Sequence, residues 1–190
     1  MAVLLALLFP LLLWSLELKP NARYVCYLAK VSDGDTLRCR FPYPVADRVR
    51  TYPVRLIGVD APENDPRKRN AKKQERELEE LIRKLYGKRV DLSAERVAEL
   101  GRRASRFVER LLLSVYAVVV ETDARPFDRY GRVLAYVWLP DGTLLNEKLV
   151  CEGYALPLSV PPNLKYEDRI WRCFEKAVRE KRGLWGELVD

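Results

Sequence analysis

The chain has 190 residues, a hydrophobic fraction of 48% and a formal net charge of +7, from 34 basic and 27 acidic side chains. This length suits one packed domain, or one domain with an appendage. The basic balance, with a pI of about 9.3, favours a polyanionic partner such as nucleic acid or an anionic membrane surface. The sequence contains 0 histidines, which excludes serine-histidine-aspartate triads, histidine metal ligands and imidazole bases.

The first residues form an apolar run over positions 2–16, broken only by Pro10 and Ser15. The run is shorter than the roughly 20 residues that span a bilayer, and its length suits the core of a signal peptide. No Lys or Arg precedes it, and no clear small-x-small cleavage site follows it. We expect residues 1–20 to be a signal peptide or an N-terminal membrane anchor, and residues 21–190 to form a domain that is secreted or faces outside the cytoplasm.

Short strands are predicted after Pro20. Residues 23–31 are rich in Tyr, Val and Leu, and a tight turn at 32–35 with a central glycine leads into a second strand at 36–41. A proline-rich link ends that strand, and residues 51–59 form a third.

A charged segment over residues 64–92 comes next. Residues 68–84 are almost continuously charged, with Leu78, Ile82 and Leu85 at helical spacing. Such a helix is either a basic arm for nucleic acid or a solvated face. Ser93 can cap a second helix. The apolar stripe of that second helix comprises Val97, Leu100, Ala104, Phe107, Val108 and Leu111.

The remainder predicts strands at 116–121 and 132–139, and helices at 144–152 and 166–181. Gly183 is expected to stop the last helix. Five short strands with a helix between the third and fourth indicate an OB-type barrel. We therefore expect an α+β fold, mainly a five-stranded β-barrel, with three packed helices and a charged helical insertion. The residues expected to face inward on the last helix are Trp171, Phe174, Ala177 and Val178.

The four cysteines show no C-x-x-C spacing, which argues against zinc. Cys26 and Cys39 flank the first predicted turn, and Cys151 and Cys173 lie on two predicted helices. Two disulfides in an exported protein and buried free thiols both agree with this placement.

Carboxylates and arginines at strand ends are the candidates for chemistry. Asp35 and Asp60 each sit beside a turn, and without histidine a cation joining them would be Ca²⁺ or Mg²⁺; ordinary turn chemistry is the alternative. Arg55 interrupts an apolar strand and needs a fixed anionic partner, either a structural carboxylate or a substrate phosphate. Glu63 and Arg132 could equally be a first-turn acid and a surface arginine.

Together these segments resemble the thermonuclease family, also called staphylococcal nuclease-like domains. The resemblance spans roughly residues 24–185. It is carried by residues 33–36 (DGDT), 54–63 (VRLIGVDAPE) and 128–136 (DRYGRVLAY), with support from 145–150 (LNEKLV), 153–155 (GYA) and the ending at 177–185.

The resemblance implies an OB barrel whose Asp35 and Asp60 carboxylates and Ala61 carbonyl bind Ca²⁺. Glu63 would act on the attacking water, as its base or its orienter. Arg55 and Arg132 would bind the scissile phosphate, and Tyr130 would border the nucleotide pocket. The charged insertion at 64–92 is longer than in compact members of the family. The proline-rich loop after Ala155 also lacks a tyrosine that stacks on the base in the best-known member.

The implied function is a Ca²⁺-dependent nuclease for single-stranded or melted DNA and RNA, with little base specificity and 3′-phosphate products. We expect a monomer that either is released or stays attached to a membrane through residues 2–16. The alternatives are a non-catalytic nucleic-acid-binding OB module and a membrane-anchored interaction domain.

Overall fold

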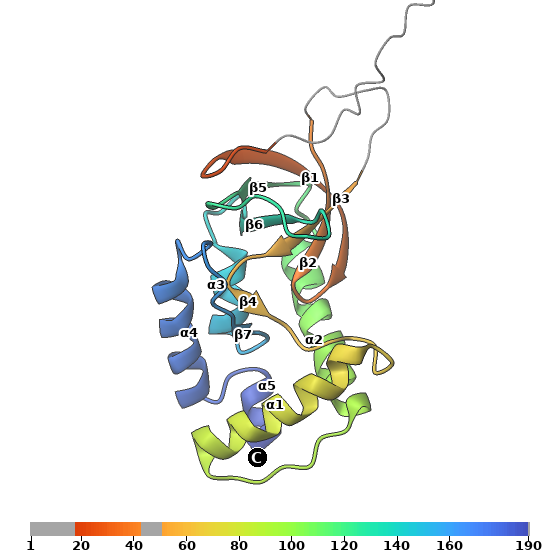
Figure 1. Cartoon of the computed structure of the whole chain (residues 1–190), viewed down its shortest axis with the longest axis vertical. Coiled ribbons are helices and arrows are strands. Elements are labelled where there is room, and N and C mark those ends of the chain that lie inside the picture. The colour runs from red at the N-terminus through yellow and green to blue at the C-terminus, as the bar shows by residue number, and fades with distance from the viewer. Residues whose placement is uncertain (1–17, 43–50, 190) are drawn as a thin grey trace, which may run out of the picture.

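A computed structural model describes residues 18–42 and 51–189 of the chain. Figure 1 shows the barrel strands at one end of the molecule and α1 and α5 at the other, with α4 and α2 on opposite sides. The strands are β1 (Arg23–Asp33), β2 (Thr36–Arg40), β3 (Tyr52–Leu56), β4 (Val59–Asp60), β5 (Ala117–Glu121), β6 (Val133–Trp138) and β7 (Leu156–Pro157). The helices are α1 (Arg69–Tyr86), α2 (Ala94–Leu112), α3 (Leu145–Cys151), α4 (Glu167–Arg179) and α5 (Leu184–Val189).

Five strands close into a barrel in the order β1-β2-β3-β6-β5. Neighbours are antiparallel except β3 and β6, which run parallel with Val54 opposite Val133. A parallel pair needs a long crossover, and α1, α2 and β5 provide it here. The predicted α+β fold with a five-stranded OB-type barrel is confirmed.

Alternating side chains on the strands fill the barrel. On β6, Val133, Ala135 and Val137 are fully buried, whereas Leu134 is only partly so. Tyr136 is the largest fully buried side chain. Its hydroxyl meets a carboxylate oxygen of Asp123 at 3.2 Å, which satisfies the one polar group that this ring carries into the core.

Both cysteine pairs that the sequence left open are disulfides in the structure. Cys26 and Cys39 join β1 to β2, and both are 0% exposed. Cys151 and Cys173 join α3 to α4. The barrel wall and the helical layer therefore each carry a cross-link.

The predicted third strand at 51–59 is two strands. β3 ends at Leu56, and Gly58 follows with φ of +79°, a left-handed conformation that glycine adopts without steric cost. After this turn β4 pairs with β7, with Asp60 opposite Leu156. The break directs Asp60 and the residues after it away from the barrel sheet.

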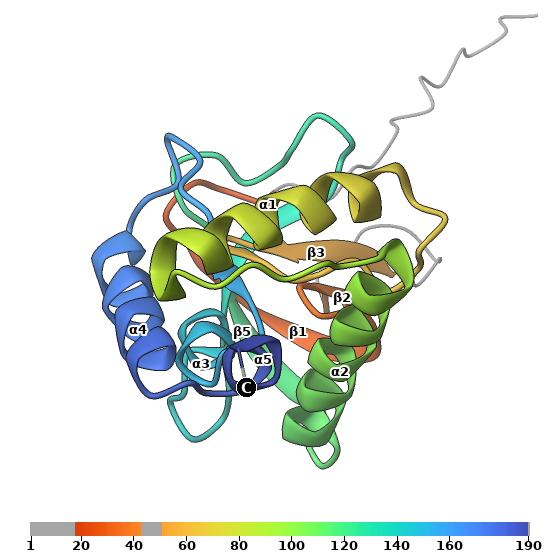
Figure 2. The ribbon, with the colours of Figure 1, turned by 90° about the horizontal axis from the view of Figure 1, so that it is seen from below.

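The charged segment forms α1, which crosses in front of the barrel when the molecule is seen from below (Figure 2). Its outer surface is solvated, but one face is buried through Ala71, Gln74, Leu78 and Ile82. Leu85, expected on that face, is 37% exposed. Tyr86 takes its place, because it lies four residues after Ile82, and its hydroxyl donates to the carbonyl of Val178 at 2.8 Å.

The other helices follow the sequence with two corrections. Ser93 caps α2 as predicted and accepts from the Arg96 amide at 3.2 Å. Trp171 does not face inward: it is 42% exposed, because the buried stripe of α4 runs through Ile170, one position earlier. α4 ends at Arg179, and the residues after Gly183 form the short helix α5, which the sequence did not predict. The other buried residues of α4 are Cys173, Phe174 and Ala177.

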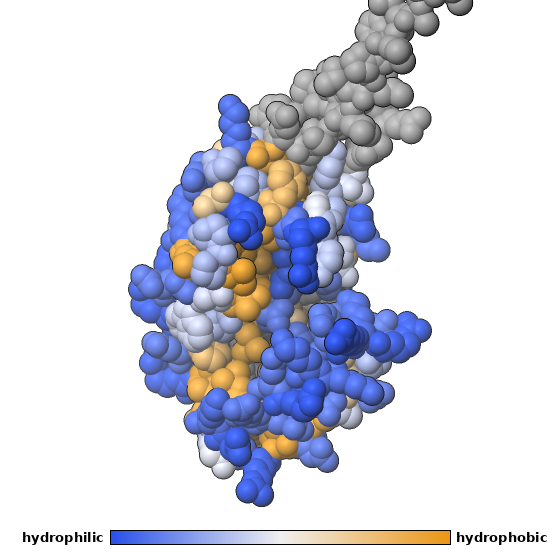
Figure 3. Space-filling model, in the orientation of Figure 1, coloured by the Kyte–Doolittle hydropathy of each residue, from blue (hydrophilic) through white to orange (hydrophobic). Residues whose placement is uncertain are grey.

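The surface in Figure 3 is mostly hydrophilic, with a hydrophobic band down its middle. Across residues 18–42 and 51–189, no helix combines the length and the apolar character needed to cross a bilayer. The predicted signal or anchor segment at 2–16 lies outside the described residues.

One buried acid lies at the end of β5. Glu121 is 1% exposed. It accepts hydrogen bonds from Arg23 Nε at 2.9 Å, Trp138 Nε1 at 2.8 Å and the Tyr166 hydroxyl at 3.1 Å, and it pairs with Lys165. Burial alone would raise the pKa of Glu121, but these donors outweigh it, and the pKa lies below its ordinary value.

Glu121→Gln is expected to lower the free energy of unfolding at pH 7 by about 2 kcal/mol, because it takes the charged acceptor away from the donors that surround it. Since the folded-state pKa is depressed, this stabilisation is present above the unfolded pKa of about 4.3 and is lost as the pH falls through the folded pKa. Urea denaturation at pH 7 and at about pH 3 measures it, with exposed Glu109→Gln as control. An equal loss of stability at both pH values would contradict the assignment.

Candidate active site

One hollow of about 210 Å³ gathers most of the residues that the sequence singled out. Tyr130 is the exception and lines a neighbouring hollow. Side chains from three distant segments of the chain therefore meet in one place. The predicted residues that line the first hollow are Asp35, Arg55, Asp60, Ala61, Glu63 and Arg132.

Strand register brings Asp35 and Arg55 together. Thr36 of β2 lies opposite Arg55 of β3, so Asp35, one residue before Thr36, lies beside the arginine. The Leu56 amide donates to the Asp35 carbonyl at 2.9 Å. The Ala61 amide donates to Oδ2 of Asp35 at 2.8 Å. This last bond joins the start of β2 to the segment after β4.

Arg55 links the two aspartates. Its Nη1 lies 2.5 Å from Oδ2 of Asp35 and its Nη2 lies 2.8 Å from Oδ1 of Asp60, with the arginine side chain 14% exposed. The sequence left open whether the partner of Arg55 is a carboxylate or a phosphate, and in the structure two carboxylates take this position. The guanidinium holds together two acids that would otherwise repel each other.

Asp35 lies in a strongly negative setting. It is 8% exposed. Burial raises the pKa of its carboxyl to about 7, with Asp33 and Asp60 adding to the effect while Arg55 and the Ala61 amide oppose it. Loss of contact with water, more than the two neighbouring acids, therefore disfavours the charged form of this carboxyl.

Helix α2 supports the segment after β4 from behind. A Cβ on Gly101 would lie 2.4 Å from the Pro62 carbonyl oxygen and 2.3 Å from that of Glu63. Only glycine allows this approach. The backbone that presents Glu63 is thus packed directly on a helix.

The Glu63 carboxylate faces residues at the start of α1. Lys68 Nζ lies 2.7 Å from its Oε2, and Asn70 Nδ2 donates to its Oε1 at 3.3 Å. The Glu63 side chain is 19% exposed. Both carboxylate oxygens are therefore oriented by the insertion, and the side chain still reaches the hollow.

Arg132 is held by the turn that precedes β6. Its Nε lies 2.6 Å from Oδ2 of Asp128, and its backbone amide donates to Oδ1 of the same residue at 2.9 Å. The Tyr130 amide donates to Asp128 as well, at 2.8 Å. Asp128 therefore fixes the conformation of this loop and the direction of the Arg132 side chain. The Tyr130 residue remains 68% exposed.

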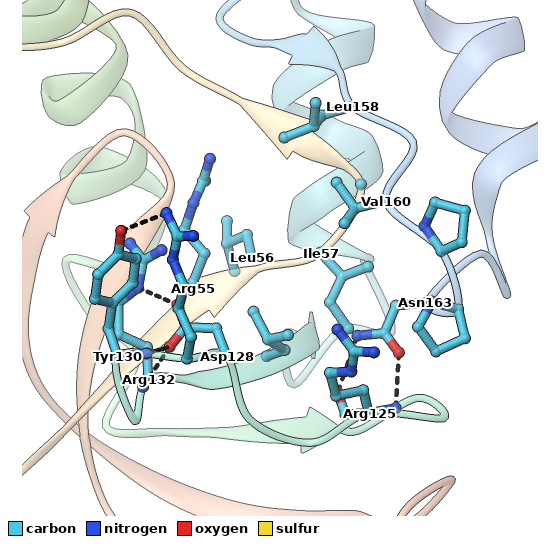
Figure 4. A pocket seen from close by; sticks show the side chains of 15 residues that line it. Arg55, Leu56, Ile57, Arg125, Asp128, Tyr130, Arg132, Leu158, Val160 and Asn163 are labelled. Atoms are coloured by element: carbon cyan, nitrogen blue, oxygen red, sulfur yellow. Dashed lines mark hydrogen bonds and ion pairs between the residues drawn. The ribbon is translucent and has the colours of Figure 1, made fainter. Parts of the chain in front are cut away.

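A second hollow of about 360 Å³ adjoins the first (Figure 4). Figure 4 shows Arg55, Arg132, Asp128 and Tyr130 together at one end and Val160 and Asn163 at the other. Arg55 and Arg132 line both hollows. The two arginines thus stand between an acidic space and a largely apolar one.

Comparison with known proteins identifies the family. The family model described as "Staphylococcal nuclease homologue" matches residues 53–187. The chain belongs to the staphylococcal nuclease family. The resemblance drawn from the sequence is confirmed.

Relatives within the staphylococcal nuclease family cover most of the chain. The thermonuclease of Staphylococcus hyicus is 34% identical over 171 residues, which are 87% of this chain and 78% of the relative. That of Staphylococcus intermedius is 35% identical over 171 residues, 87% of this chain and 79% of the relative. Endonuclease YhcR of Bacillus subtilis (strain 168) is 26% identical over 171 residues, 88% of this chain and 12% of the relative. Family membership and these names support a nuclease, an enzyme that hydrolyses phosphodiester bonds.

Sequence reasoning missed three side chains of this staphylococcal nuclease-like site: Lys68, Asn70 and Gln74, all from the charged insertion. Gln74 had a usable signal. It is the only glutamine in the chain, and it lies four residues before Leu78 on the apolar face of its helix. A neutral polar residue at such a position needs a buried partner. Lys68 and Asn70 carried no signal that set them apart from their charged neighbours.

The donor set in this nuclease-family site suits a hard cation. Within the two described ranges, no three acidic or cysteine side chains are arranged to hold a metal by themselves. The Asp35 and Asp60 carboxylates and the carbonyl of Ala61 are nevertheless oxygen donors of residues that line one hollow. Ca²⁺ takes six to eight oxygens and accepts water among them. Two carboxylates, one carbonyl and water therefore fit it.

Proposed function

We propose that the protein is an exported, Ca²⁺-dependent nuclease that hydrolyses single-stranded or melted DNA and RNA with little base specificity and leaves 3′-phosphate ends. One observation carries the proposal: Arg55 and Arg132 line both the acidic hollow and the apolar one. A phosphate between these arginines would place its nucleoside on one side and the carboxylates on the other. Guanidiniums bind phosphate oxygens in bidentate fashion.

Asp35, Asp60 and the Ala61 carbonyl would hold the cation. When bound, Ca²⁺ supplies positive charge that offsets the negative charge of the phosphodiester. The same residues position the arginine, since Arg55 contacts both aspartates in their present arrangement.

Glu63 acts on the attacking water. Its carboxylate acts as the base that takes a proton from this water or as the acceptor that orients it. The water oxygen bonds to phosphorus, the bond from phosphorus to the 5′-oxygen breaks, and the 5′-oxygen takes a proton from solvent to leave as a hydroxyl. Lys68 and Asn70 fix the direction of that carboxylate. Arg55 and Arg132 stabilise the charge that develops on the phosphoryl oxygens, without reorganisation at the moment of reaction.

The apolar hollow would hold a base without reading its edges. Leu158, Val160 and two prolines line it, and they offer surface rather than hydrogen bonds. Asn163 could read a base, but its Oδ1 accepts from the Arg125 amide at 2.8 Å and its Nδ2 donates to the Arg125 carbonyl at 2.9 Å. A base that enters must leave its stack, which favours unpaired strands.

Export is supported by the two disulfides, because such cross-links persist in oxidising compartments. The apolar run at 2–16 would direct the export, as a signal or as an anchor. We further propose that the protein works as a monomer.

Ca²⁺ removal tests this function. Purified protein should cleave 5′-labelled single-stranded DNA and RNA in the presence of Ca²⁺, and chelation with EGTA should abolish cleavage while the circular dichroism spectrum of the fold persists. Duplex DNA should be cut more slowly until it is melted. Product 3′ ends that can be ligated only after phosphatase treatment would establish 3′-phosphates. Product 5′ ends that a kinase labels directly would establish the matching 5′-hydroxyls.

Asp35→Asn and Asp141→Asn form a matched pair for this assay, since Asp141 belongs to a turn with Thr143 outside both hollows. Only Asp35→Asn should lose Ca²⁺-stimulated cleavage. Binding of DNA without cleavage in every lane would instead identify a nucleic-acid-binding module.

A further inference from the structure

The inserted helix α1 buries one neutral polar side chain next to the candidate site. Gln74 is 8% exposed and shares its face of the helix with Ala71, Leu78 and Ile82. Burial of an amide is costly unless all of its hydrogen-bonding groups find partners. The partners that Gln74 finds all belong to residues 60–63, the segment that leaves β4.

All three contacts of the Gln74 amide are complementary. Its Oε1 accepts from the Glu63 backbone amide at 2.8 Å. Its Nε2 donates to Oδ2 of Asp60 at 3.2 Å and to the carbonyl oxygen of Ala61 at 3.2 Å. The opposite amide orientation would place donor against donor and acceptor against acceptor, so the partners fix which way the amide faces.

We propose that Gln74 is a positioning residue of the active site, through which α1 holds Asp60, Ala61 and Glu63 in their working geometry. The inference rests on the proposed function. Gln74 does not line the hollow; it acts from behind the residues that do. Its amide braces two of the three oxygen donors assigned to the cation and the backbone of the residue assigned to the water.

The beginning of the same helix reinforces this arrangement. Lys68 and Asn70 orient the Glu63 carboxylate, while Gln74 holds the Glu63 backbone. The inserted segment therefore contacts both ends of one residue. An insertion that only added a solvated helix would have no need for an uncharged amide here.

Residues of similar size could not make all three of these contacts from position 74. A methionine at position 74 matches the length of glutamine but leaves the Glu63 N–H and the Ala61 carbonyl without this partner. A glutamate keeps an acceptor for the Glu63 N–H and turns its other oxygen toward two acceptors, Asp60 Oδ2 and the Ala61 carbonyl. The two substitutions thus separate the contact of the Gln74 amide oxygen from the contacts of its nitrogen.

The test compares full-length Gln74→Met and Gln74→Glu with Leu78→Ala, a control that loosens α1 one turn further along the same buried face. Calorimetric titration with CaCl₂ in the absence of nucleic acid measures cation affinity, and steady-state kinetics separate kcat from KM. Gln74→Met should weaken Ca²⁺ binding by about 10-fold and lower kcat by a similar factor, as losses of supporting contacts do, with little change in KM. Leu78→Ala should lower the melting temperature and leave Ca²⁺ affinity within about twofold, because it changes no contact to the donors.

Hydrogen exchange of the peptide that covers residues 60–63 gives a readout that needs neither metal nor substrate. Protection of the Glu63 amide should fall in Gln74→Met and persist in Gln74→Glu and Leu78→Ala. Wild-type protection in Gln74→Met, or equal losses of Ca²⁺ affinity in Gln74→Met and Leu78→Ala, would overturn the inference. If wild-type protein binds Ca²⁺ and cleaves DNA in those cases, only the role of Gln74 fails; a wild type that does neither contradicts the proposed function itself.

Discussion

Arg132→Ala is expected to lower kcat for cleavage of single-stranded DNA by about 10³-fold, the scale seen when one preorganised donor is removed from a charged transition state. Arg132 lines both hollows, so its guanidinium is placed to meet a phosphate between them. KM should rise by much less, because Arg55 remains to bind the ground-state phosphate. Single-turnover cleavage at saturating enzyme isolates the chemical step and measures the effect directly.

The loop around Arg132 should survive the substitution. Asp128 keeps its bonds to the backbone amides of Tyr130 and Arg132, at 2.8 Å and 2.9 Å, and neither bond uses the arginine side chain. Arg132→Lys retains the charge but not the bidentate geometry, and it should recover only part of the rate. The matched control is Arg106→Ala, an exposed arginine of α2 that lines neither hollow. Equal losses from Arg106→Ala and Arg132→Ala would remove the special role of Arg132.

Local patterns were sufficient to predict the barrel strands and the long helices. Apolar and β-branched content with flanking turn residues marks β1, β2, β5 and β6, and Ser93 with its apolar stripe marks α2. Each of these signals lies within one segment of the chain, so it can be recognised from the sequence alone. Closure of the barrel does not lie within one segment: the parallel pairing of β3 with β6 joins Leu56 to Ala135 across two helices and two strands.

The errors have specific causes. The strand predicted at 51–59 is mostly apolar, and periodicity alone does not show that Gly58 would turn the chain with a positive φ. Trp171 was placed inward for its hydrophobicity, but helical phase puts Ile170 on the buried stripe. Its indole instead meets Ser159 Oγ at 3.2 Å and packs edge-on against Phe174. An amphipathic ring of this kind is stable at the surface.

The site residues that lie in short motifs could be predicted from the sequence. Asp35, Arg55 and Asp60 stand at strand ends, where acids and arginines need partners, and the structure brings both aspartates within hydrogen-bonding distance of Arg55. Gln74 comes from an insertion, and its three bonds depend on how α1 docks. Tertiary docking of a charged helix leaves little trace in a one-dimensional pattern.

Glu63→Gln should lower kcat by about 10³-fold, within the range for loss of a positioned general base, and should leave Ca²⁺ affinity within a few-fold because Glu63 is not among the assigned donors. The amide keeps the size of the carboxylate and cannot accept the proton of water. Single-turnover rates give the first quantity, and titration with CaCl₂ in the absence of nucleic acid gives the second. Asp60→Asn is the converse variant: it removes an oxygen assigned to the cation, so its main effect should be weaker Ca²⁺ binding.

The pH dependence of Glu63→Gln separates a chemical role from a structural one. A carboxylate is a weak base at neutral pH, so the wild-type rate should rise toward alkaline pH as hydroxide becomes available. If Glu63 accepts the proton, hydroxide compensates in part for its loss, and the gap between wild type and variant narrows as the pH rises. If Glu63 only orients water, the gap stays constant across the same range. A wild-type rate in Glu63→Gln at neutral pH would exclude both roles, since Lys68 and Asn70 would then be holding a carboxylate that takes no part in the reaction.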